Sequence, residues 1–74
     1  MDTDFGRIAR ILLTARKDAG LKQLALAAQI GVADSTLASW ELGIRQPQMK
    51  HFVKWCDALG FVLVPVRKER RAAA

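Results

Sequence analysis

The side chains that most often carry out chemistry in proteins are scarce in this sequence. Its 74 residues contain one histidine, His51, and one cysteine, Cys56. One cysteine excludes an internal disulfide, and the two residues together are too few for a Cys/His zinc cage. There is no Ser-His-Asp set and no phosphate-binding glycine loop. The sequence therefore predicts no enzyme, no metal site and no cofactor; we expect a solvated His51 and an inert, buried Cys56 thiol.

Positive charge is concentrated near the end of the chain. Twelve Lys and Arg against seven Asp and Glu give a net charge of +5, and residues 67–71 carry +3 of it. The hydrophobic content of 51% indicates one globular domain, which at this size is marginally stable alone and favours a partner or a second copy. Because the first residues are acidic and polar and no apolar run approaches the roughly 20 residues of a membrane span, we expect a cytoplasmic protein.

Glycines divide the chain into four predicted helices. Four glycines each follow a stretch in which apolar residues recur at helical spacing, as glycines that end helices do. The expected all-α fold has four or five helices, four of them at about residues 4–19, 22–30, 34–42 and 48–59, ended by Gly20, Gly31, Gly43 and Gly60. Apolar spacing predicts which side chains of the outer helices face the core. These are Phe5, Ile8, Leu12, Ala15 and Ala19 in the first helix and Met49, Phe52, Val53, Cys56 and Leu59 in the last. Trp55 is also expected in the core, and Trp40 at its edge.

Residues 22–43 carry the most specific pattern in the sequence. Two short helices and a tight turn at Gly31-Val32 occupy about twenty residues, which is helix-turn-helix geometry. Gly31 permits a left-handed turn, and the small Ala27 lets the two helices approach closely.

The sequence resembles the lambda-repressor-like (Xre/Cro-type) helix-turn-helix family over roughly residues 7–60. The matching residues are Gly20-Leu21, Gln23, Leu26-Ala27, Ile30-Gly31-Val32, Ser35-Thr36-Leu37, Trp40-Glu41-Leu42-Gly43, Pro47 and Ala58-Leu59-Gly60. The chain departs from the family where Ser or Thr usually caps a helix: Lys22, Ala33 and Gln48 stand there instead. Asp34 is the alternative cap of the third helix, one residue late.

The resemblance implies a DNA-binding site. It implies that Gln23 contacts a phosphate at the start of the second helix, and that the third helix lies in the major groove. Asp34, Ser35 and Ser39 would then face base edges, with Thr36 nearer the backbone and Arg45 on a phosphate. Asp34 has a second interpretation, as a first-turn partner of the helix dipole. Arg16 and Glu41 match a pair that joins the first helix to the third in this family.

The end of the chain differs from the rest. Residues 61–66 are short, apolar and rich in β-branched side chains, which predicts a strand, and no other segment is predicted to pair with it. We therefore divide the chain into a helix-turn-helix domain (1–60), a dimerisation strand (61–66) and a basic tail (67–74). Phe61, Val62, Leu63 and Val64 would pair between two copies; the alternative is a segment packed on its own first helix. The tail either follows DNA phosphates or serves as a solvated end.

Two functions are compatible with this sequence. The first is a homodimeric transcriptional regulator, a repressor by preference, that binds an inverted repeat in double-stranded DNA. The second is an antitoxin that neutralises a toxin and regulates its own operon. It is favoured by the terminal strand and by apolar Leu24, Leu42 and Ile44, which form either a docking patch or ordinary scattered surface residues.

Overall fold

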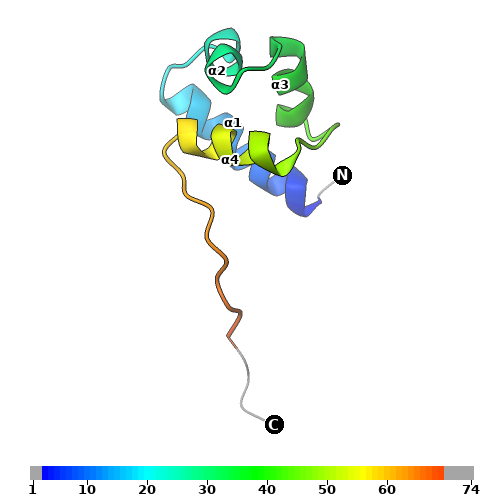
Figure 1. Ribbon diagram of the computed structural model, residues 1–74, viewed down its shortest axis with the longest axis vertical. Coiled ribbons are helices and arrows are strands. Elements are labelled where there is room, and N and C mark those ends of the chain that lie inside the picture. Colours follow the sequence, from blue (N-terminus) through cyan, green and yellow to red (C-terminus); the bar gives the residue numbers. More distant parts are fainter. Residues whose placement is uncertain (1–2, 70–74) are drawn as a thin grey trace.

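Four helices pack around one core in the computed structural model, which describes residues 3–69 (Figure 1). They are α1 (Asp4–Asp18), α2 (Gln23–Ile30), α3 (Asp34–Glu41) and α4 (Met49–Ala58). Their bounds lie within one residue of the predicted ones. All four predicted helix-ending glycines have positive φ. At Gly31, φ is 92°, a conformation that is costly for a residue with a Cβ, so this glycine makes the turn between α2 and α3.

The helix starts differ in how they are capped. Thr3 caps α1, because its hydroxyl oxygen accepts a hydrogen bond from the Gly6 amide at 2.8 Å. The caps of α2, α3 and α4 are Lys22, Ala33 and Gln48, and none of them makes a side-chain cap bond. The alternative in which Asp34 caps α3 is wrong, since Ala33 has the extended cap conformation and Asp34 is the first helical residue. Asp34 therefore meets the helix dipole from inside the first turn.

The core is built from all four helices. Its buried side chains are Ala9, Leu12, Leu26, Ala27, Ile30, Leu37, Trp40, Trp55 and Cys56. Trp55 is fully buried, as predicted, and its ring lies 5.6 Å from that of Trp40, between ring centroids. Trp40 is 4% exposed, so its expected place at the edge of the core is wrong.

The buried faces of the outer helices correct two predictions. In α4, Met49 and Val53 were expected inside but are 69% and 46% exposed. Phe52, Trp55, Cys56 and Leu59 instead form the inward stripe, because burying the indole of Trp55 turns the helix away from Met49. In α1, Ile8 and Ala19 are exposed, and Ala9 and Leu12 are the buried residues.

The segment that follows α4 leaves the helical body. Residues 61–69 form no helix and no strand with any of residues 3–69, and they extend away from the four helices (Figure 1). The prediction of a strand is therefore not met within a single chain, for the physical reason that a strand needs a partner for its backbone hydrogen bonds. Residues 70–74 of the predicted basic tail lie outside the described residues.

Candidate nucleic-acid interface

A buried ion pair joins α1 to α3. The Arg16 Nε donates to Glu41 Oε2 at 2.7 Å, and a second guanidinium nitrogen donates to Oε1 at 3.2 Å. Both side chains are largely buried, with 11% of Arg16 and 3% of Glu41 exposed. Arg16 also donates to the Leu21 carbonyl at 2.8 Å. This pair therefore holds the end of α3 against α1 and the turn before α2, and a buried pair of this kind fixes orientation more than it adds stability.

Gln23 belongs to the same network. Its side-chain nitrogen donates to Glu41 Oε1 at 2.9 Å, so one amide hydrogen is already used inside the protein. The second amide hydrogen and the side-chain oxygen keep their hydrogen-bonding capacity. A phosphate at the start of α2 would therefore meet a glutamine whose position is set by Glu41. The sequence pattern did not indicate this hydrogen bond between Gln23 and Glu41.

The exposed polar face of α3 lies next to the loop that follows it. Asp34 and Ser35 are exposed, while Thr36 and Ser39 are half-buried. A hollow of about 220 Å³ is lined by Ser35, Thr36, Ser39 and Arg45. Four of the six predicted DNA-binding residues thus share one recess, which we call the α3 recess. Asp34 and Gln23 lie outside it.

Backbone hydrogen bonds hold Arg45 beside this helix. The amides of Ile44 and Arg45 both donate to the Ser39 carbonyl, at 2.9 and 3.3 Å. The loop therefore folds back along α3 after Gly43 and brings Arg45 to the wall of the α3 recess. The Ser39 hydroxyl donates to the Thr36 carbonyl at 2.8 Å. None of these three bonds could be predicted from the pattern of side chains, because all three acceptors are backbone oxygens.

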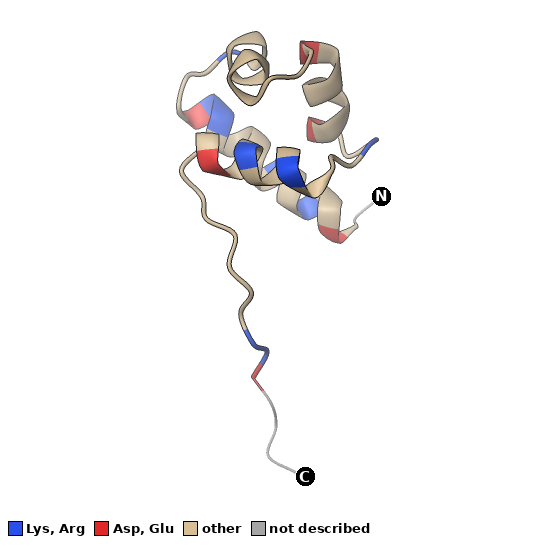
Figure 2. Ribbon diagram, in the orientation of Figure 1, with Lys and Arg blue, Asp and Glu red and all other residues tan. Residues whose placement is uncertain are grey.

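Charge is distributed unevenly over the helices (Figure 2). Lys22 and Arg45 balance Asp34 and Glu41 within residues 22–45, so the segment that contains α2 and α3 is neutral. Exposed cations are more frequent on the other two helices, at Arg7, Arg10 and Lys17 of α1 and at Lys50 and Lys54 of α4. Arg7 pairs with Asp4 one turn away in α1, which cancels part of that charge.

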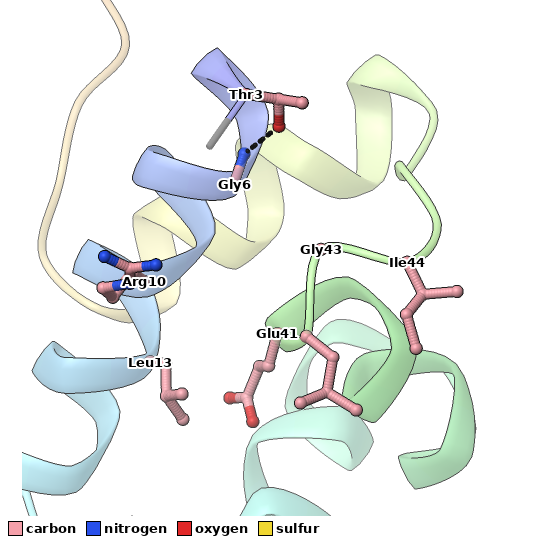
Figure 3. Close-up of a pocket in the computed structure, with 8 residues that line it drawn as sticks. Thr3, Gly6, Arg10, Leu13, Glu41, Gly43 and Ile44 are labelled. Atoms are coloured by element: carbon pink, nitrogen blue, oxygen red, sulfur yellow. Dashed lines mark hydrogen bonds between the residues drawn. The ribbon is translucent and has the colours of Figure 1, made fainter. Parts of the chain in front are cut away.

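A second, larger hollow lies between α1 and the loop after α3 (Figure 3). Its volume is about 570 Å³, and its walls are Thr3, Gly6, Arg10, Leu13, Glu41, Leu42, Gly43 and Ile44. The Glu41 carboxylate is bonded to Arg16 and Gln23, so it offers little free charge to this hollow. Leu42 and Ile44 are strongly exposed at its rim.

The histidine and the cysteine take structural places. His51 is half-buried and its ring lies 5.9 Å from that of Trp40, between centroids, rather than standing free in solvent as expected. Cys56 is buried, and desolvation raises the pKa of its thiol above the ordinary value. Within residues 3–69 no three His, Cys, Asp or Glu side chains gather as metal ligands would. In the same range, no helix has the length and apolar character needed to cross a membrane.

The comparison with protein families agrees with this geometry. A family model described as helix-turn-helix (HTH_3) matches residues 12–62, which is most of the chain and includes α2, the turn, α3 and α4. The chain belongs to the lambda-repressor-like (Xre/Cro-type) helix-turn-helix family. Domains of this family bind DNA and are not enzymes, so the chain is a DNA-binding helix-turn-helix protein of the regulator type.

Solved structures share the fold of this helix-turn-helix domain. The clp gene regulator ClgR from Corynebacterium glutamicum superposes with a TM-score of 0.77 at 23% identity, over 82% of this chain and 65% of that one. This chain thus spans just under two thirds of the length of that regulator. A chain of the HipA–HipB–O2–O3 complex superposes with a TM-score of 0.78 at 19% identity, over 93% of this chain and 97% of the other. No curated protein matches the sequence.

Proposed function

We propose that this protein is a homodimeric transcriptional regulator that binds an inverted repeat in double-stranded DNA through α3. Two copies related by a two-fold axis would place their α3 helices in successive major grooves, about 34–36 Å apart. Its action is that of a repressor, since a dimer bound across a promoter needs no chemistry to block polymerase.

The α3 recess is the observation that carries this proposal. Ser35, Thr36 and Ser39 present hydroxyl groups on one side of α3, and Arg45 lies at the same place. Behind them, Arg16, Glu41 and Gln23 fix α3 relative to α1 and α2. A helix held rigidly with a small, polar outer face fits the major groove, whereas a flexible helix would lose affinity to ordering.

The proposed dimer supplies what one chain lacks. In this proposal, Phe61, Val62, Leu63 and Val64 of two copies pair as antiparallel strands. Support comes from the exposure of these four apolar residues in one chain, because an exposed apolar segment of extended backbone favours pairing with another chain. Doubling also helps binding, since the segment that carries α2 and α3 is neutral and affinity for DNA depends on the number of phosphates neutralised.

Selection of DNA ligands from a random pool tests the proposal directly. The full-length protein should enrich a sequence with two-fold symmetry and half-sites about one helical turn apart. Enrichment of a single, asymmetric site would contradict the homodimer. Equal retention of all sequences would contradict sequence-specific regulation.

A second candidate function is neutralisation of a toxin, with DNA binding used for autoregulation. The observation that favours it is the superposition over 97% of a chain that forms part of the HipA–HipB–O2–O3 complex. Exposed Leu24, Leu42 and Ile44 add apolar surface outside the α3 recess. Co-expression of this protein with the products of neighbouring genes would test this function. If one of those products stops growth, the wild-type protein should restore growth and the Leu42→Asp variant should not. If the protein binds its operator fully and no neighbouring gene product is toxic, toxin neutralisation is rejected and transcriptional regulation is the remaining function.

A further inference from the structure

Ser39 and Arg45, which both line the α3 recess, differ in the hydrogen bonds that their side chains can make. The guanidinium of Arg45 can only donate hydrogen bonds. Within residues 3–69 it makes no hydrogen bond or ion pair that would use its side-chain donors. The Ser39 hydroxyl has committed its hydrogen to the Thr36 carbonyl, so the lone pairs of its oxygen are what remain for a ligand.

This combination fits a phosphate poorly. Phosphate oxygens are acceptors, so they suit Arg45 but face only lone pairs at Ser39. The resemblance to the family implies separate contacts, with Arg45 on a phosphate and Ser39 on a base edge, whereas in the structure both residues line one recess. The backbone amides of Ile44 and Arg45 donate to the Ser39 carbonyl, which ties the backbone at Arg45 to that at Ser39. A ligand in the recess meets both.

A G·C base pair has the complementary pattern in the major groove. Guanine presents two neighbouring acceptors, N7 and O6, and cytosine presents the N4 amino donor beside them. An A·T pair instead places the adenine amino donor between two acceptors, so a guanidinium cannot donate to two adjacent atoms there. A paired donor and acceptor such as Arg45 and Ser39 therefore distinguish G·C from A·T.

We propose that Arg45 and Ser39 together recognise one G·C base pair in each half-site. Arg45 donates to guanine N7 and O6, and Ser39 Oγ accepts from the cytosine amino group. This assignment rests on the proposed function, because it specifies which base pair the recess takes once α3 lies in the major groove. It makes Arg45 a specificity-determining residue rather than a phosphate contact.

Base analogues in the selected operator test the assignment with full-length protein. 7-Deazaguanine removes the N7 acceptor, and inosine keeps both N7 and O6. At one guanine per half-site, 7-deazaguanine should weaken binding by roughly ten-fold while inosine leaves it unchanged. Arg45→Ala should weaken binding by roughly ten- to a hundred-fold and abolish the effect of 7-deazaguanine at that guanine. Ser39→Ala should reduce discrimination against A·T at the same pair.

Lys54→Gln provides the matched control, since it also removes one exposed cation but lies on α4. This variant should keep the full effect of 7-deazaguanine. An Arg45→Ala variant that binds all sequences equally less well, with the salt slope reduced by about one, would place Arg45 on a phosphate and overturn the assignment. If the wild-type protein enriches no DNA at all, the proposed function itself fails, a result distinct from enrichment without a critical G·C pair.

Discussion

Several polar side chains in this protein make hydrogen bonds inside the fold, and these bonds fix the positions of the helices and limit the groups that remain for a ligand. Glu41 shows this most clearly, because its two carboxylate oxygens accept from Arg16 on α1 and from Gln23 on α2. One buried side chain thereby fixes three helices relative to one another. The resemblance to the family implied the pair with Arg16, but the bond to Gln23 depends on how closely α2 approaches the end of α3, which no residue pattern specifies.

Removal of Glu41 should destabilise the fold strongly. Glu41→Ala leaves the Arg16 side chain, which is 11% exposed, without its charged partner, and breaking a buried pair in this way costs about 3–5 kcal/mol. Urea unfolding followed by circular dichroism measures the loss. The double variant Arg16→Met, Glu41→Leu should lose less than Glu41→Ala alone, because it leaves no uncompensated charge. A double variant as unstable as the single one would contradict this account.

The thiol of Cys56 should be protected by the fold. Because burial raises its pKa, the folded state keeps the thiol proton to higher pH than the unfolded state does. Stability from this residue is therefore present below the unfolded pKa and declines as pH rises from that value toward the folded pKa. Iodoacetamide should label Cys56 at pH 8 in urea but only slowly in buffer. Cys56→Ala should show a smaller loss of stability between pH 8 and 10 than the wild type. Rapid labelling of the folded protein would contradict this burial.

At the scale of elements, the sequence predicts where helices lie better than which way they face. Glycines that end helices and a proline before α4 are local signals, so the bounds were predicted closely. The face of α4 was predicted only in part, with Phe52, Cys56 and Leu59 correct and Met49 and Val53 wrong, because two overlapping stripes are both apolar. One contains Met49 and Val53, and the other contains Trp55. Only packing against Phe5 and Trp40 decides in favour of the larger indole, whose ring lies 6.5 and 5.6 Å from theirs.

The uncapped start of α4 offers a test of element stability. Gln48 has φ −65° and ψ 155°, the extended conformation of a cap, but its side chain makes no cap bond. Gln48→Asp should therefore stabilise the protein by about 0.5–2 kcal/mol, which raises the melting temperature by roughly 4–8 °C per kcal/mol in a domain of this size. Calorimetry measures the change, with Gln48→Ala as the control that adds no acceptor. Equal melting temperatures for the two variants would show that the terminus of α4 gains nothing from a cap.

At the scale of the whole molecule, what one chain leaves incomplete indicates what a second chain supplies. The apolar segment after α4 has the composition of a strand, yet within residues 3–69 it has no strand to pair with. Prediction from the sequence stops here for a physical reason: composition can indicate a preference for extended backbone, but pairing depends on another molecule. The α3 recess lies beyond prediction for a similar reason, since it exists only because the loop at Arg45 folds back onto Ser39.

Substitutions in the terminal segment should separate the dimer from the fold. Val62 and Val64 are 82% and 65% exposed in one chain, so Val62→Asp with Val64→Asp removes little packing from the monomer. In paired strands, however, residues two apart share a face, and carboxylates from both copies would repel there. We expect light scattering to give the mass of a monomer and the free energy of unfolding to change little. Operator affinity should fall, because a monomer binds only one half-site.

The control is Leu24→Asp, which changes an exposed apolar residue on α2 and should leave the protein dimeric. If the double variant, or a truncated protein that lacks residues 61–74, is still fully dimeric, the interface lies elsewhere. The exposed side chains of Met49 and Val53 on α4 would then be the next surface to test.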